Sequence, residues 1–219
     1  MSDFSAFAEM ERRSWSDAAR AFGYVQLFAS APDQAIKSLL DAAGAGRDLR
    51  ALDLCCGQGN VSEALLNRGC RVVGVDFSSA MLAFARKRAR KSIFIQADAQ
   101  DLPFPDAEFD LVVSNLGVCH RPDFHQFARP DVAVKLLSKA GFSNIDATTV
   151  DCVWNLKAPE DLFEIYAKGT VRAAMLLSKQ PPENLAAIRS ALTARVREQF
   201  SSGDHWRVPV PAALVRASA

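Results

Sequence analysis

The sequence predicts an α/β protein built on a mostly parallel, doubly wound sheet with helices on both faces and an N-terminal helical cap. Short apolar segments alternate with helical segments between residues 51 and 115. That alternation is typical of parallel strands joined by helices and buried on both faces. The 219 residues are 49% apolar and 23% charged, which is enough for one domain with a sizeable core.

Composition also excludes several classes of protein. The formal net charge is +1, so no global field attracts nucleic acid or an anionic membrane. The chain has no apolar run near the ~18–20 residues of a membrane span, and residues 1–13 carry no signal-peptide pattern. Five cysteines without C-x-x-C spacing favour thiols in a reducing compartment over disulfides or a zinc site. We therefore expect a soluble, cytoplasmic protein.

The first elements follow in order along the chain. Residues 5–46 are predicted to be helical, and residues 51–54 form a short apolar strand. A helix over residues 61–67 follows the glycine-rich loop, with Asn60 as its expected cap and Glu63 completing a box-like start.

The alternation then continues through three more strands. Gly69 is expected to end the helix, and Ser78 or Ser79 to cap the next one, which carries Met81 on its apolar face. The predicted strands lie at residues 71–75, 93–96 and 111–115.

The C-terminal half is less regular. A helix should begin at Pro130 and stop at Gly141. Beyond it we expect a strand, two helices and a proline-interrupted last strand, at residues 145–156, 159–179, 182–200 and 207–218. We treat residues 1–219 as one domain: a cap over 1–46, a cofactor-binding core over 47–123 and a substrate-side part over 124–219.

The loop Cys55-Cys56-Gly57-Gln58-Gly59 lies between a strand and a helix. Glycines there let the backbone pass close to a ligand, where a Cβ would clash. The following helix directs its free N–H groups and positive dipole end toward the loop. An ordinary tight turn between a strand and a helix would show the same glycines, so the loop by itself does not establish a ligand site.

Acidic residues follow the next two strands. Asp76 ends the second strand, at the same sheet edge as the glycine loop, where it could accept hydrogen bonds from both hydroxyls of a ribose. Asp98 and Ala99 follow the third strand and could recognise the edge of an adenine. The alternative for Asp76 is a helix N-terminal acid.

These motifs together resemble class I S-adenosylmethionine-dependent methyltransferases of the small-molecule type that includes quinone-biosynthesis enzymes. The resemblance covers residues 15–123 and rests on LDLCCGQG, VVGVDFSSAML, QADAQDLPFPDAEFDLVVSN and the Asn115–His120 region. It implies a Rossmann-like fold, S-adenosylmethionine as cofactor, and in-line transfer of its methyl group to a small-molecule acceptor.

The resemblance also assigns roles. Gly57 and Gly59 would contact the methionine part of the cofactor, and Asp76 would hold the ribose. Asn115 and Leu116 would line the methyl end. The full predicted cofactor site is Asp53, Cys55, Gly57, Gly59, Asp76, Phe77, Met81, Asp98, Ala99, Asn115 and Leu116. Cys55 stands where the family usually has glycine or another small residue.

The chemistry needs little from side chains, because positioning alone can supply about 7–11 kcal/mol. His120 could deprotonate an acceptor, although a surface histidine is the simpler interpretation. His120, Asp123 and His125 match no firm ligand pattern, so we predict no metal. Trp15, Tyr24 and Phe28 are expected to pack in the core or lid, which hints at an apolar or aromatic acceptor.

Two competing functions remain. A nicotinamide-dependent oxidoreductase would want a third glycine where Ser62 stands. A non-catalytic S-adenosylmethionine-binding relative would carry the same cofactor-site motifs in its sequence. The basic run at residues 86–91 lacks interleaved aromatics, so no nucleic-acid partner is expected. The chain would act as a monomer or homodimer.

One region departs from the resemblance. The family normally has a helix, a glycine-rich turn and a fifth strand between the segments that here meet at Asp123 and Phe124. Either the protein lacks that unit, or a stretch of roughly fifty residues is omitted from this sequence. A true deletion would leave the hydrogen-bonding groups of the fourth strand unpaired unless another strand fills the gap, so we favour omission.

Overall fold

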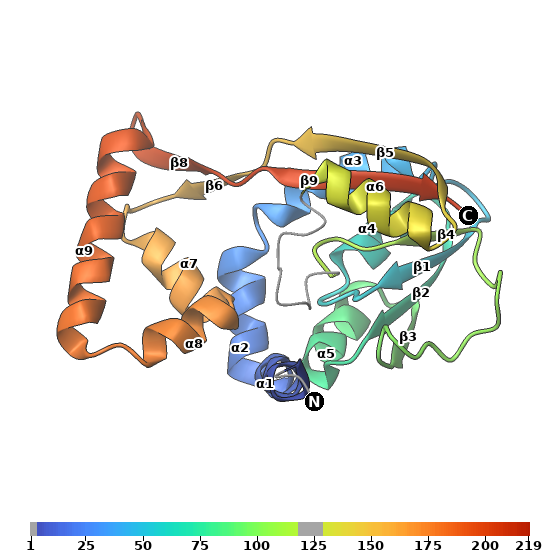
Figure 1. Cartoon of the computed structure of the whole chain (residues 1–219), viewed down its shortest axis with the longest axis horizontal. Helices are drawn as coiled ribbons and strands as arrows, with labels where there is room; N and C mark the ends of the chain where they lie inside the picture. Colours follow the sequence, from blue (N-terminus) through green and yellow to red (C-terminus); the bar gives the residue numbers. More distant parts are fainter. Residues whose placement is uncertain (1–3, 118–128) are drawn as a thin grey trace.

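The computed structural model describes residues 4–117 and 129–219, and its centre is a four-stranded parallel sheet (Figure 1). The strand order is β3-β2-β1-β4, and every neighbouring pair is parallel. The strands are β1 (Arg50–Leu54), β2 (Arg71–Asp76), β3 (Ile93–Gln96) and β4 (Leu111–Val113). The predicted parallel sheet is therefore confirmed, with a fourth strand shorter than expected.

Helices pack on this sheet through a buried apolar cluster. The cluster joins Leu40 of α3 (Ile36–Ala42) and Leu65 of α4 (Asn60–Asn67) to Ala51, Val72 and Val113 on the strands. Burying side chains of this size contributes about 1.5–3 kcal/mol each. Helix α5 (Ser79–Arg88) contacts β2 and β3. This packing fixes the loops at the carboxyl ends of the strands.

Two helix starts differ in how they are capped. Ser78 caps α5 as predicted, because its hydroxyl accepts from the Met81 N–H at 3.1 Å. The Asn60 cap was wrong. Gly59 is the cap of α4 with φ +82°, and Asn60 is already the first helical residue. Its side chain therefore bonds elsewhere, to Asp33.

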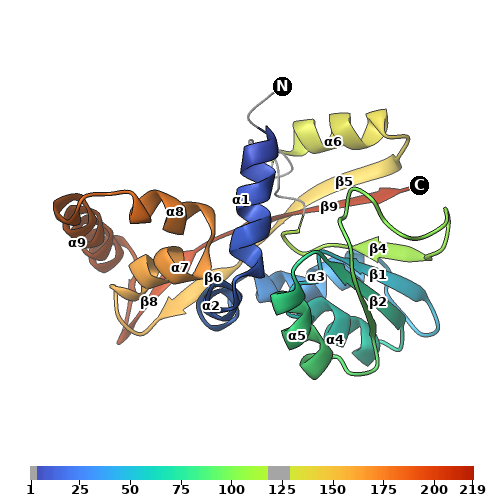
Figure 2. The same cartoon turned by 90° about the horizontal axis from the view of Figure 1, so that it is seen from below.

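The N-terminal cap is helical as predicted. It contains α1 (Phe4–Ser16), α2 (Ala18–Gly23), one π-helical turn η1 (Tyr24–Phe28) and one 3₁₀ turn η2 (Pro32–Ala35), followed by α3. Figure 2 shows α1 standing between the central sheet and the C-terminal helices. The Ser78 hydroxyl donates to the Trp15 carbonyl at 2.6 Å, which fastens the end of α1 to the start of α5.

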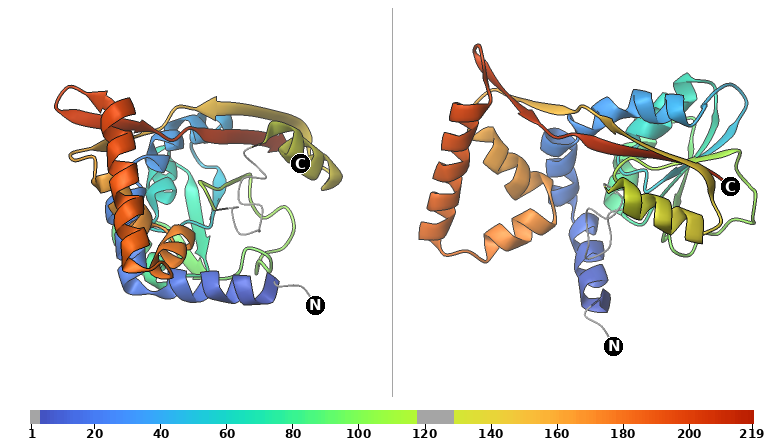
Figure 3. Two further views of the ribbon diagram at one scale, coloured as in Figure 1. Left: turned by 60° about the vertical axis from the view of Figure 1, so that its left-hand side comes forward. Right: turned by 45° about the horizontal axis from the view of Figure 1, so that its top comes forward.

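The C-terminal half contains two small antiparallel sheets, which the sequence did not predict. One pairs β5 (Ser143–Val150) with β9 (Ala212–Ser218), beside α6 (Pro130–Lys139). The other has the order β6-β8-β7, from β6 (Val153–Leu156), β8 (His205–Pro209) and β7 (Ser201–Ser202). Figure 3 shows these segments running from the C-terminal helices toward the central sheet.

Three expected elements of this half are interrupted. The strand over 145–156 breaks into β5 and β6 around Cys152, and the last strand breaks at Pro211, which has no N–H to donate. The helix over 159–179 divides into α7 (Asp161–Gly169) and α8 (Arg172–Ser178), because Thr170 takes an extended conformation. The helix α9 (Pro182–Gln199) forms as predicted.

Within the described residues, β4 is an edge strand of the central sheet. Its partner is β1, whereas the last strand β9 pairs with β5. Val112 of β4 is 56% exposed, so its side chain has little cover from the described part of the chain. No described strand thus takes the place of the expected fifth strand. The Asp123–Phe124 junction lies outside the described residues, and the omission stays a prediction.

None of the helices in the described ranges combines the length and the apolar character needed to cross a membrane.

Candidate functional site

A cavity of about 580 Å³ opens where the carboxyl ends of the parallel strands face the N-terminal cap and the C-terminal helices. This volume lies within the usual range of about 300–1,000 Å³ for small-molecule sites. The glycine loop, the ends of β2 and β4, and the start of α5 line one half. Aromatic side chains from α1, η1, β6 and α7 line the other half. We call these the loop half and the aromatic half.

The glycine loop turns through backbone conformations that L side chains rarely adopt. Cys55 has φ +57° and Gly57 has φ +52°. A Cβ built on Gly57 would meet no atom within 4 Å, and Gly57 lines the cavity. A Cβ on Gly59 would lie 3.0 Å from both Cα and Cβ of Ala85 in α5. The first glycine therefore leaves space for a ligand, whereas the second permits close helix packing.

Asp76 holds the loop from the end of β2. Its two carboxylate oxygens accept from the Gly57 N–H at 2.9 Å and from the Ser78 N–H at 2.8 Å. Its exposed fraction is 8%, and it lines the cavity. A carboxylate can accept more than two hydrogen bonds. Asp76 thus acts both as a brace for the loop and as a candidate acceptor for ligand hydroxyls.

Asp53 lies deeper under the same loop. Its carboxylate accepts from the Ser62 hydroxyl at 2.6 Å, and its exposed fraction is 1%. Burial, with a smaller contribution from the neighbouring Asp76 charge, raises the pKa of Asp53 to about 7, even though hydrogen bonds with Ser62 act to lower it. Ser62, which stands where a dinucleotide-binding loop would have its third glycine, is therefore used to hold this acid.

The structure brings most of the predicted cofactor residues to the loop half. The predicted residues that line the cavity are Asp53, Cys55, Gly57, Asp76, Phe77, Met81, Asn115 and Leu116. Burial raises the pKa of the Cys56 thiol, the neighbour of Cys55, so that group stays protonated near neutral pH. Asn115 donates to the Pro32 carbonyl at 3.0 Å, which ties the end of β4 to the cap.

Three predicted residues lie elsewhere. Gly59 packs against α5, as described above, and Asp98 and Ala99 are outside the cavity lining. Asp98 instead pairs with Arg12 of α1 at 2.6 Å. Their cofactor roles stay predictions.

His120, Asp123 and His125 lie outside the described residues. Within the described ranges, no three histidine, cysteine or acidic side chains gather as metal ligands would. That observation does not reach these three residues, so the absence of a metal also remains a prediction.

The aromatic half is a continuous chain of five rings. Trp15 and Tyr24 meet edge to face at 5.3 Å between centroids, and Tyr24 stacks on Phe28 at 5.3 Å. Phe28 meets Trp154 at 5.2 Å, and Trp154 meets Tyr166 at 6.0 Å, both edge to face. All five rings line the cavity. Such a wall suits a flat or apolar ligand.

Two of these rings have fixed polar contacts. The Trp154 indole N–H donates to the Phe28 carbonyl at 3.0 Å. The Trp15 indole N–H donates to Glu11 at 3.1 Å, and Glu11 also pairs with Arg172 at 2.9 Å. Glu11 is 5% exposed, so this ion pair is largely removed from water. The rings are therefore oriented by hydrogen bonds as well as by packing.

The sequence predicted only part of this wall. Trp15, Tyr24 and Phe28 were expected in the core or lid, and they line the cavity. Trp154, Tyr166, Glu11, Arg172 and Asp33 were missed. No spacing marks them, because they lie on elements far apart in the chain. The aromatic side chains of two of them were the available signal, because Trp154 lies within the predicted strand over 145–156 and Tyr166 within the predicted helix over 159–179.

Comparisons with known proteins show what the segment around the loop half is similar to. Residues 52–141 match the family model described as a methyltransferase domain. This segment is similar to methyltransferase domains. It contains the glycine loop, Asp53, Asp76, Met81 and Asn115, so the resemblance inferred from the sequence is confirmed.

Relatives with curated descriptions match over the same region. A malonyl-[acyl-carrier protein] O-methyltransferase of Enterobacter lignolyticus is 41% identical over 81 residues, 37% of this chain and 32% of the relative. A demethylmenaquinone methyltransferase of Beutenbergia cavernae is 40% identical over 82 residues, 37% of this chain and 34% of the relative. The matched part of the chain thus spans about a third of the length of these relatives.

The fold extends the likeness beyond the matched segment. The solved structure of phosphoethanolamine N-methyltransferase 2 from Haemonchus contortus superposes with a TM-score of 0.57. It is 18% identical, and the match covers 97% of this chain and 60% of that one. At this identity the comparison concerns the fold, and it confirms the Rossmann-like architecture around the matched segment.

Proposed function

We propose that the chain binds S-adenosylmethionine in the loop half of the cavity and transfers its methyl group to a small-molecule acceptor held in the aromatic half. One observation carries the proposal: the motif-bearing loop of a methyltransferase domain and a wall of five rings line one cavity. A group-transfer enzyme needs two such adjoining half-sites, because the reacting atoms must approach within about 3–3.5 Å.

The residues present fit this cofactor. Gly57 leaves open space in the cavity that a Cβ would fill. The buried Oδ1 of Asn60, at the start of α4, has no hydrogen-bond partner among the described residues. A ligand donor such as an ammonium group would satisfy that oxygen. Asp53 and Asp76 add negative charge to the lining, which favours a cationic ligand.

When bound, S-adenosylmethionine supplies a methyl group activated by a sulfonium. Asp76 would accept from the ribose hydroxyls, and Phe77 and Met81 would flank the adenine. Asn115 and Leu116, at the end of β4, would lie at the methyl end. The aromatic half would orient the acceptor and exclude water. Catalysis would thus depend mainly on positioning, which can contribute about 7–11 kcal/mol.

Calorimetry and a transfer assay test this proposal. We expect S-adenosylmethionine and S-adenosylhomocysteine to bind with one-to-one stoichiometry, and NAD and NADP not to bind. Transfer of a tritiated methyl group to single-ring acceptors then separates an enzyme from a non-catalytic relative. Binding of NAD in preference to S-adenosylmethionine would reinstate the oxidoreductase.

The state of the thiols supports the proposed cellular compartment. Cys56, Cys70 and Cys152 are not in disulfides, which supports a reducing, cytoplasmic compartment. The proposed partner is the small-molecule acceptor, with no nucleic acid, and the chain would act as a monomer or homodimer. The alternative of a non-catalytic relative keeps the same cofactor and loses only the transfer.

A further inference from the structure

One short turn joins the two halves of the cavity. In η2, the Pro32 carbonyl accepts from Asn115 at the end of β4, at 3.0 Å. The next residue, Asp33, accepts through its carboxylate from the Asn60 side-chain amide at the start of α4. Both bonds lead into the loop half.

The residue after Asp33 is bonded toward the aromatic half of the cavity. The Gln34 side chain donates to the Val153 carbonyl at 2.8 Å and accepts from the Val153 N–H at 3.0 Å. Val153 begins β6 and precedes Trp154 of the aromatic wall. Three consecutive residues of one turn are therefore bonded to the end of β4, the start of α4 and the start of β6, and Asp33 is the central one.

This arrangement places a carboxyl group at the junction of the two halves. Asp33 is half-buried and lines the same cavity as Asn115 and Trp154. Its backbone is fixed as well, because its N–H donates to the Ala29 carbonyl at 3.0 Å. Under the proposed function, the methyl group passes from one half to the other at this junction.

We propose that Asp33 is the catalytic base that takes a proton from the acceptor, and that the acceptor is a neutral hydroxyl or amine compound rather than a carboxylate. This inference rests on the proposed function. The acceptor heteroatom uses its lone pair to form a bond to the methyl carbon. The bond between that carbon and sulfur breaks, its electron pair stays on sulfur, and the proton of the acceptor passes to the Asp33 carboxylate.

The surroundings of Asp33 suit a base. Burial raises its pKa, whereas the Asn60 hydrogen bond and the distant Arg88 charge lower it. The other charged groups that line the cavity are Asp53, Asp76 and the Glu11–Arg172 pair. A carboxylate acceptor has no proton to lose and would be repelled by these acids, so the same geometry selects against it.

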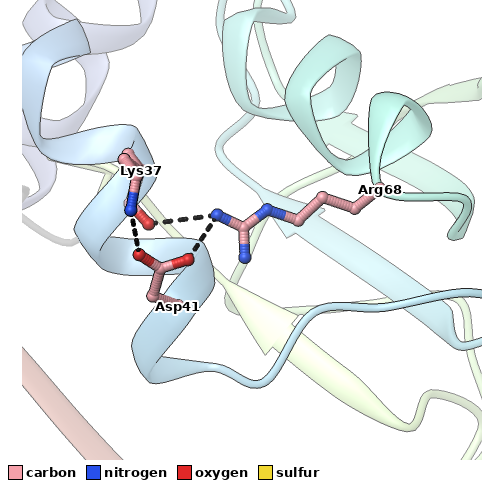
Figure 4. A network of polar contacts seen from close by, with 3 residues as sticks. All are labelled: Lys37, Asp41 and Arg68. Atoms are coloured by element: carbon pink, nitrogen blue, oxygen red, sulfur yellow. Dashed lines mark hydrogen bonds and ion pairs between the residues drawn. The ribbon is translucent and has the colours of Figure 1, made fainter.

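The chain offers a matched control for Asp33. Asp41 lies eight residues further on, in α3, and Figure 4 shows its two oxygens paired with Lys37 and Arg68. The two ion pairs measure 2.7 Å and 2.6 Å. These partners lower the pKa of Asp41, the opposite of the shift at Asp33. Asp41 is outside the cavity lining. Asp41→Asn therefore makes the same chemical change away from the site.

A first experiment measures binding without turnover. Catechol and benzoate are titrated by calorimetry into the protein saturated with S-adenosylhomocysteine. We expect catechol to bind about tenfold more tightly than benzoate, a difference that Asp33→Asn reduces severalfold and Asp41→Asn leaves unchanged. Equal affinities in the wild type, or a ratio that Asp33→Asn does not alter, would overturn the acceptor class.

A second experiment measures transfer of a tritiated methyl group to catechol, aniline and benzoate. For the neutral acceptors, Asp33→Asn should lower kcat by about 10²–10⁴-fold and remove the acid limb of the pH–rate profile. The affinity for S-adenosylmethionine should stay within about threefold, and Asp33→Glu should restore part of the rate.

Three results would overturn the role of Asp33: an Asp33→Asn rate within about threefold of wild type, benzoate as the preferred acceptor, or no transfer to either neutral acceptor by a wild type that binds S-adenosylmethionine. Failure of the proposed function itself is distinguishable, because the wild type would then either not bind S-adenosylmethionine or bind it without methylating any of the three acceptors, benzoate included.

Discussion

The two halves of the cavity are built in different ways. In the loop half, most of the lining residues come from one segment between Asp53 and Met81, joined by Asn115 and Leu116 at the end of β4. Asp76 holds the loop through backbone N–H groups. In the aromatic half, Trp15 and Trp154 come from elements far apart in the chain and are connected through the rings of Tyr24 and Phe28. The loop half is specified by local sequence, and the aromatic half by tertiary packing. Substitutions should therefore affect cofactor binding and stability separately.

Removing a ring from the wall should have the largest effect. Trp154 is 2% exposed and donates to the Phe28 carbonyl. We expect Trp154→Ala to lower the free energy of unfolding by about 3–5 kcal/mol, measured by urea denaturation. Trp154→Phe, which keeps a ring and loses the indole donor, should cost less. The folded fraction should still bind S-adenosylmethionine normally. A large loss of that affinity in Trp154→Phe would mean that the halves are not independent.

Changing Asp76 in the loop half should weaken cofactor binding and leave the protein folded. Asp76→Asn keeps one oxygen acceptor and loses the charge and the second. We expect the affinity for S-adenosylmethionine to fall by roughly 10- to 150-fold, because a hydrogen bond to a charged group contributes about 1.5–3 kcal/mol. Calorimetry measures this loss, and a melting curve should show the protein still folded. Unchanged affinity would limit Asp76 to bracing Gly57 and Ser78.

The same contrast explains what could be predicted from the sequence. The four parallel strands were found because short apolar runs and helix caps such as Ser78 are local signals. The antiparallel sheets were missed because the interruption at Cys152 looks like continuous strand sequence. Asp33 was missed because its partner Asn60 is 27 residues away, and a Pro-Asp pair at a helix start looks like ordinary capping. Asn60 itself was assigned as a helix cap because its bond to the distant Asp33 leaves no local signal in the sequence.

The two glycines of the loop sharpen the comparison further. Both have positive φ, so alanine at either position should cost about 1–2 kcal/mol of backbone strain. Gly59→Ala also clashes with Ala85 and should lose more stability. Gly57→Ala places its Cβ in the cavity and should instead weaken S-adenosylmethionine binding, by about tenfold. Paired melting and calorimetry measurements test this, and equal profiles for the two variants would contradict it.

The smallest effect concerns the pH dependence of the loop half. Burial raises the pKa of Asp53 to about 7, from 3.8 for an unburied aspartate. The folded protein therefore binds this proton more tightly than the unfolded chain does. Through this group, the free energy of unfolding should fall as pH rises from about 4 to about 7 and then level off. Asp53→Asn should remove that component of the pH dependence of stability.

The affinity for S-adenosylmethionine should change with pH in the opposite direction to the stability, and rise as pH rises. The sulfonium charge of S-adenosylmethionine favours ionised Asp53, whereas S-adenosylhomocysteine has no sulfonium. Calorimetry between about pH 6 and about pH 8 should therefore show the affinity for S-adenosylmethionine rising relative to that for S-adenosylhomocysteine, by at most about tenfold per pH unit for one group. The ratio should be flat in Asp53→Asn. Parallel pH dependence of the two ligands in the wild type would show that Asp53 braces Ser62 without sensing the cofactor charge.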